Sequence, residues 1–114
     1  MASQYESGAA SVAQADVDAT TLTDVYTNAR KGVRVFVKNI FICNRSASAI
    51  TFRLSVAVAG AADDVSQYLY YGTSIPANDT FQIETNLPLG PADVVRLWSS
   101  DTATSVSVFG TTQP

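Results

Sequence analysis

An alternation of apolar and polar side chains after residue 49 is the feature that most restricts what this chain can fold into. Apolar side chains stand at every even position of the stretch: Ile50, Phe52, Leu54, Val56 and Val58. A period of two is typical of a strand with one buried face, whereas a helix repeats every 3.6 residues. The stretch therefore predicts a strand in a sheet that has a core on one side.

The segment just before this strand has a different pattern. Residues 40–43 are apolar on both faces, which indicates a strand deep in a sheet or one that bends through a bulge. A change of phase near Lys38 and Asn39 is where we expect that bulge. Residues 44–49 supply turn-forming side chains and no apolar anchor, so the sequence predicts a hairpin as the spine of a β-sandwich.

Short β-prone segments recur along the rest of the chain, separated by turn signals such as Pro76 to Thr80. We predict an all-β fold: a single antiparallel β-sandwich, jelly-roll-like, with seven or eight short strands over residues 20–114. Residues 1–19 are mostly Ala, Ser, Gln, Asp and Gly, and are expected to form an extended, flexible N-terminal arm. Residues 87–93 contain two prolines and are interpreted as a crossing rather than a strand.

Composition points toward assembly rather than toward nucleic acid. Only 15% of the residues are charged and the net charge is −3, whereas a nucleic-acid binder needs clustered Lys and Arg. Low charge is typical of surfaces that are buried against partners. We expect no nucleic-acid partner and no membrane partner, since neither a signal peptide nor a run of about 20 apolar residues is present. Cys43 is expected to be a small buried apolar side chain.

Catalytic chemistry has little support in the sequence. The chain has no histidine, which removes the commonest general base, the commonest metal ligand and the ordinary serine and cysteine triads. Five carboxylates in or beside turns leave a glycosidase pair as a minor alternative: Asp63, Asp64, Asp79, Glu84 and Asp93. A calcium site is a second minor alternative, with oxygen ligands from Asp63 and Asp64 and from Asn78 and Asp79. We predict no enzyme activity, no catalytic residue, no cofactor and no metal.

The segment from Gln67 to Gly72 carries three of the five tyrosines. Strict alternation puts Tyr68 and Tyr70 on one face and Tyr71 on the other, so at least one tyrosine is expected near solvent or a partner. Trp98 together with these tyrosines offers a possible sugar-stacking platform, but its neighbours in the chain favour a core position. We select six residues as a possible assembly interface: Tyr5, Arg30, Lys31, Tyr68, Tyr70 and Tyr71.

Four strings of the sequence carry a resemblance: IFICNRSASAITFRLSVA, QYLYYGTSIPANDTF, LGPADVVRLWSS and SVSVFG. They resemble a family of small β-rich structural proteins of tailed-phage and prophage virions, over about residues 20–110. The basic turn at Arg30 and Lys31 and the long N-terminal segment depart from that pattern.

The resemblance implies a virion component, made in the host cytoplasm, with no enzymatic site. The leading expectation is a capsid decoration, or cement, protein that binds and stabilises the major-capsid lattice as a homo-oligomer, a trimer or dimer. A tail, baseplate or fibre component is the first alternative. A carbohydrate-binding module for host-surface glycans, acting through Trp98 and the tyrosine strand, is the second.

Overall fold

The computed structural model describes residues 10–29 and 31–113, which form eight strands and two short 3-10 turns. The strands are β1 (Ala10–Val17), β2 (Thr23–Thr27), β3 (Arg34–Asn44), β4 (Ile50–Ala57), β5 (Tyr68–Ile75), β6 (Thr80–Leu89), β7 (Val94–Ser99) and β8 (Thr104–Gln113). The 3-10 turns η2 (Val58–Gly60) and η3 (Val65–Gln67) lie between β4 and β5.

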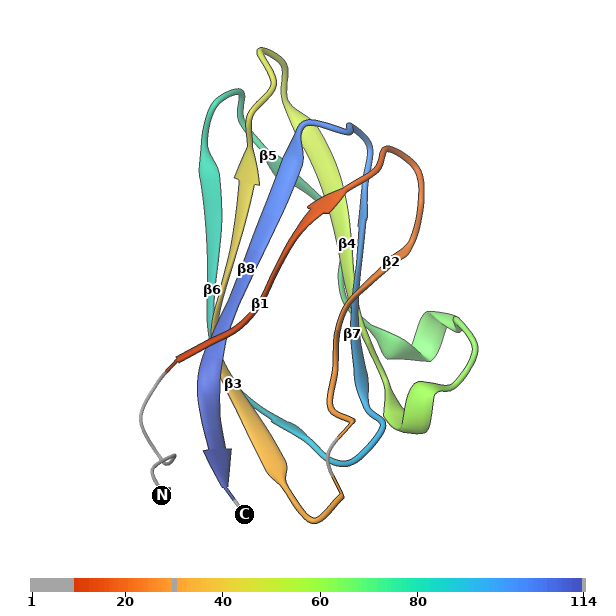
Figure 1. The fold of residues 1–114 in the computed structure, drawn as a ribbon. Coiled ribbons are helices and arrows are strands. Elements are labelled where there is room, and N and C mark those ends of the chain that lie inside the picture. Colours follow the sequence, from red (N-terminus) through yellow and green to blue (C-terminus); the bar gives the residue numbers. More distant parts are fainter. Residues whose placement is uncertain (1–9, 30, 114) are drawn as a thin grey trace.

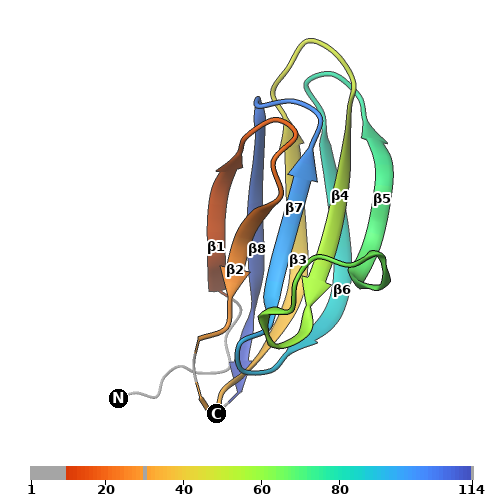
Figure 2. The same cartoon turned by 90° about the vertical axis from the view of Figure 1, so that its right-hand side faces the viewer.

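The strands form two four-stranded antiparallel sheets that pack face to face. The first sheet has the order β1-β8-β3-β6, and the second has the order β2-β7-β4-β5. Figure 1 shows the two layers, and Figure 2 looks onto the second sheet. Eight strands in these two orders are the arrangement of a jelly roll. The predicted all-β, jelly-roll-like sandwich is confirmed.

The predicted hairpin is wrong, because β3 and β4 belong to different sheets. Residues 45–49 cross from one layer to the other instead of turning back within a layer. The Asn44 side chain holds this crossing: its Nδ2 donates to the carbonyl oxygens of Ser48, Ile75 and Pro76, and its Oδ1 accepts from the Ser46 N–H. Asn44 is fully buried, so these bonds satisfy polar atoms that water cannot reach.

The core lies between the two layers. Its largest fully buried side chains come from seven strands, every one except β2, and the bulkiest of them are Phe52, Ile40, Ile42, Leu54, Ile75, Leu89 and Leu97. Burying one such side chain contributes roughly 1.5–3 kcal/mol. The alternation seen in the sequence is therefore the inward face of β4 from Ile50 to Val56, whereas Val58, expected to continue it, lies beyond the strand and is exposed.

The expected bulge in β3 is confirmed. Pairing of β3 with both β6 and β8 shifts between Val37 and Asn39. Lys38 is the extra residue, so Val37 and Ile40 both point into the core and both have 0% exposure. Cys43 comes after the shift and is only half-buried, which corrects the expectation of a buried thiol.

Two further expectations need correction. Residues 10–17 of the predicted flexible arm form β1, an edge strand paired with β8, and Val17 is 1% exposed because it fills the core. Residues 1–9, with Tyr5, lie outside the described residues. Pro88 lies inside β6, opposite Phe36. An edge strand tolerates proline because one side of its backbone needs no hydrogen-bond partner.

Candidate binding site on the outer face of the second sheet

Two irregular positions in β5 decide which tyrosines face outward. The pairing of β4 with β5 skips Leu69 and Gly72, and Gly72 takes a positive φ of 79° at its bulge. Tyr68 and Tyr71 consequently share the outer face, whereas Tyr70 turns inward. The prediction that Tyr68 and Tyr70 share a face is wrong, because each bulge reverses the alternation.

Tyr70 packs in the interior. Its ring lies 5.8 Å from the ring of Phe52 and 5.7 Å from that of Phe81, between ring centres. It is therefore part of the core packing and not of an exposed interface.

Three side chains from neighbouring strands form what we name the aromatic–arginine row: Trp98 of β7, Arg53 of β4 and Tyr71 of β5. Arg53 is paired in register with both of the others. Its guanidinium carbon lies 4.2 Å from the Trp98 ring centre and 4.3 Å from the Tyr71 ring centre. The guanidinium is thus held between two aromatic rings, an arrangement favoured by cation–π attraction.

The Arg53 guanidinium has no anionic partner within residues 10–29 and 31–113. The two ion pairs found there join Arg45 to Asp16 and Arg96 to Asp24. Arg53 Nε is buried without a hydrogen-bond partner, and the two Nη atoms are neither buried nor hydrogen-bonded within this part of the chain. The row therefore presents unused N–H donors at the surface.

Trp98 was expected to favour a core position, and the structure corrects this. Val95 and Leu97 are 1% and 0% exposed and point into the core, whereas Trp98 is only partly buried. Alternation along β7 places Trp98 opposite to Leu97. That signal was already present in the sequence, since a residue next to an inward-facing one in a strand faces outward.

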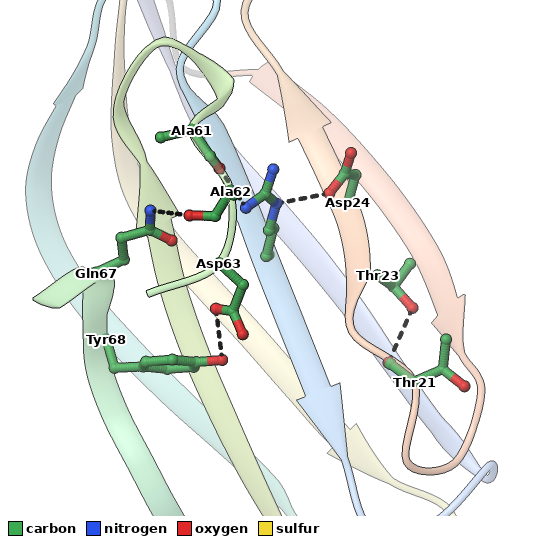
Figure 3. Close-up of polar contacts among 9 residues, drawn as sticks. Thr21, Thr23, Asp24, Ala61, Ala62, Asp63, Gln67 and Tyr68 are labelled. Carbon is green, nitrogen blue, oxygen red and sulfur yellow. Dashed lines mark hydrogen bonds and ion pairs between the residues drawn. The ribbon is translucent and has the colours of Figure 1, made fainter. Parts of the chain in front are cut away.

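A second row lies beside the first and is mostly polar: Asp24 of β2, Arg96 of β7, Ser55 of β4 and Tyr68 of β5. Arg96 Nε donates to Asp24 Oδ1 at 2.9 Å, and one Nη donates to the Ala61 carbonyl oxygen at 2.8 Å. In Figure 3, Asp24 and Ala61 lie on opposite sides of the guanidinium that donates to both of them. Arg96 thus has an anionic partner and a carbonyl acceptor, in contrast to Arg53.

Residues 58–67 form a loop that this second row anchors. The Tyr68 hydroxyl donates a hydrogen bond to Asp63 Oδ1 at 2.9 Å, and Gln67 Nε2 donates one to the Ala62 carbonyl oxygen at 2.8 Å (Figure 3). Burial, and then the hydrogen bond and negative charge of Asp63, raise the pKa of the Tyr68 hydroxyl. The hydroxyl consequently stays protonated as a donor to Asp63.

Exposed apolar side chains are concentrated in one stretch of the chain. Four large hydrophobic side chains stand out as exposed within the described residues: Val58 at 68%, Val65 at 80%, Leu69 at 52% and Tyr71 at 61%. All four lie between residues 58 and 71, in the loop and in β5, and Figure 1 shows this loop projecting from the outer side of the second sheet. We name these four side chains the apolar patch. These side chains give this stretch apolar surface that a partner could cover.

The six residues selected as a possible interface are only partly brought together. Tyr68 and Tyr71 lie in adjacent rows of the outer face. Lys31 is exposed in the turn between β2 and β3, whereas Arg30 and Tyr5 lie outside the described residues. Arg53 was not selected, although its outward position in an alternating strand and its aromatic neighbours across the sheet make it the centre of the row.

Four of the five carboxylates considered for calcium or glycosidase chemistry accept hydrogen bonds within the fold, Asp63 from Tyr68 as described above. Asp64 accepts from the Ser66 hydroxyl, Asp79 from the Thr80 N–H, and Asp93 from the N–H groups of Ala59 and Gly90. Across the part of the chain that the structure describes, no three Asp, Glu or Cys side chains gather in a way that would hold a metal ion. None of the described segments is a helix long and apolar enough to cross a membrane.

Neither the protein-family models nor the curated protein sequences include a match to this chain. The resemblance to phage virion proteins therefore stays a prediction.

Proposed function

We propose that this protein is a structural component of a phage virion, a capsid decoration protein that docks on the major-capsid lattice and stabilises it. The observation that carries the proposal is the aromatic–arginine row on the outer face of the second sheet, together with the exposed side chains of the apolar patch, of which Tyr71 belongs to the row itself. Tryptophan, tyrosine and arginine are the residue types that contribute most to protein–protein binding. A face of this composition is suited to being covered by another protein.

Two features of the whole chain support the same proposal. Charged residues make up only 15% of it, which lowers the cost of removing its surface from water. The sandwich also has four edge strands, β1, β6, β2 and β5. Burial of an edge against another subunit is one way to protect its unpaired backbone groups.

Stabilisation would follow from repetition and from mass action. Each docked copy contributes a modest contact, and contacts that span two capsid subunits make the second binding step intramolecular. A protein that binds only the intact lattice stabilises it by an amount that grows with its concentration relative to the dissociation constant. No deep pocket is needed for this role.

The test compares purified particles with and without the protein. Particles that lack it should lose their contents at a lower temperature and at a milder osmotic shock, and adding the recombinant protein should restore resistance. Equal resistance of both kinds of particle would contradict the proposal. A copy number that matches the capsid lattice would separate decoration from a tail, baseplate or fibre part, which is present in far fewer copies.

A carbohydrate-binding module is a second candidate, favoured by the presence of Trp98, Tyr71 and Tyr68 on one outer face. Binding to a glycan array that is abolished by Trp98→Ala, in a variant that remains folded, would support it. Arg53 covers the face of the Trp98 ring and the face of the Tyr71 ring that are turned toward it, so only the opposite face of each ring is left for a sugar. This makes the protein interface the better-supported role.

A further inference from the structure

We propose that Arg53, clamped between Trp98 and Tyr71, is the docking point for a carboxylate side chain, Asp or Glu, on the partner protein. This inference rests on the proposed function and adds the chemistry by which the partner is recognised. It assigns to Arg53 a specific contact that the other described cations do not offer.

The geometry of the clamp matches a carboxylate. A guanidinium presents its N–H groups in the plane of the ion, and a carboxylate accepts two of them in parallel. The ring centres of Trp98 and Tyr71 lie 4.2 and 4.3 Å from the Arg53 guanidinium carbon and belong to the strands on either side of β4, so a partner reaches the guanidinium at the edge that the rings leave open. The Nη atoms lie at that edge, and no partner for them is found in residues 10–29 and 31–113.

The clamp also lowers the cost of binding. An arginine on an open surface loses side-chain freedom when it pairs, and this cancels much of the gain. Arg53 is already ordered by two rings and by its place in the central strand pair of the sheet, so less freedom remains to be lost.

The surroundings favour a protein over an acidic sugar as the source of the carboxylate. Tyr71 belongs both to the row and to the apolar patch, whose other members are Val58, Val65 and Leu69. Aliphatic side chains of this kind can pack against apolar side chains that surround an acidic residue on a partner protein. A sugar site, by contrast, needs protein groups that form hydrogen bonds with the hydroxyls around the sugar ring. The unpaired positive charge then supplies the complementarity that fixes the register of docking.

The test measures binding of the recombinant full chain to particles purified without it. Arg53→Gln should weaken binding about ten-fold or more, because one charge-assisted pair is lost at a desolvated site. Arg53→Lys should be intermediate, since it keeps the charge but loses the planar stacking. Arg45→Gln, which removes an exposed cation in the loop after β3, is the matched control and should bind like the original chain.

Trp98 is the single tryptophan of the chain, so its fluorescence reports directly on the clamp. Docking at Arg53 should change the Trp98 emission on addition of particles, and the change should be absent in Arg53→Gln. Thermal unfolding of each variant confirms that it is folded before binding is compared.

Each outcome decides the matter. Loss of binding in Arg53→Gln but not in Arg45→Gln supports the inference. Equal binding by Arg53→Gln and the original chain overturns it while leaving the decoration role intact. Failure of the original chain to bind particles overturns both proposals. Binding to glucuronic-acid oligosaccharides that depends on Arg53, without particle binding, would assign the site to an acidic glycan instead.

Discussion

The guanidinium carbon of Arg53 lies 4.2 Å from the ring centre of Trp98, and the two residues are directly paired across β4 and β7. The contact lies on the face of the sheet that turns away from the core. It joins a cation to an aromatic ring, and neither of the two residues paired with Arg53 across the sheet, Trp98 and Tyr71, is a carboxylate.

This contact should contribute measurably to stability. In a double-mutant cycle of Arg53→Gln and Trp98→Leu, we expect a coupling energy of about 0.5–1 kcal/mol from the cation–π attraction. Urea unfolding of the four proteins measures it. A coupling indistinguishable from zero would show that the two side chains are neighbours without attraction.

The two adjacent tyrosines of β5 should respond differently to truncation. Tyr70→Ala removes a ring packed on Phe52 and Phe81, so the free energy of unfolding should fall by about 3 kcal/mol. Tyr71→Ala, at 61% exposure, should cost less than about 1 kcal/mol. Chemical denaturation distinguishes the two, and a reversed order would contradict the bulge assignment at Gly72.

Gly110 should not tolerate a larger residue. A Cβ at this position would lie 2.3 Å from the Phe36 carbonyl oxygen and 3.1 Å from the Phe36 carbonyl carbon, which are backbone atoms of the paired strand β3. Gly110→Ala should therefore destabilise the fold by about 3 kcal/mol or prevent folding.

Gly90→Ala is the matched control for this substitution. A Cβ added at Gly90 would have Asp93 Oδ2 as its nearest neighbour outside the adjacent residues, at 3.6 Å, which is an ordinary contact distance. The free energy of unfolding should therefore change by less than about 1 kcal/mol in this variant. Thermal unfolding of both variants checks the prediction. Similar melting temperatures would mean that β3 and β8 do not approach as closely as described.

Stability should fall at alkaline pH partly through Tyr68. Its pKa is raised above 10.0 by burial and by Asp63, so the folded state binds this proton more tightly than the unfolded state. The contribution is fully present below pH 10 and is lost as the pH rises through the folded-state pKa.

Measurement of the free energy of unfolding from about pH 8 to 11 tests this linkage. The free energy of unfolding should decline less steeply above pH 10 in Tyr68→Phe than in the original chain. In Tyr71→Phe the bond from Tyr68 to Asp63 is kept, so the free energy of unfolding should decline as in the original chain. Parallel curves for all three proteins would contradict the raised pKa.

Much of the candidate site was accessible to sequence reasoning, but not its centre. The alternation in β7 places Trp98 outward once Leu97 is recognised as a core residue, and Tyr71 was selected as an interface candidate. Arg53 was missed because its significance depends on the residues beside it on two other strands. Those neighbours are 18 and 45 positions away in the chain.

Sequence alone determined the all-β class, the bulge at Lys38 and the inward face of β4, because each follows from the period of two within a single strand. Only the tertiary structure decided that β3 and β4 lie in different sheets, that residues 10–17 join the sandwich, and that Tyr70 is internal. Strand partners are chosen by packing between segments far apart in the chain, and a one-residue bulge reverses a face without changing the composition. The aromatic–arginine row depends on both: β7, β4 and β5 pair as neighbours, and the bulge at Gly72 places Tyr71 on the outer face.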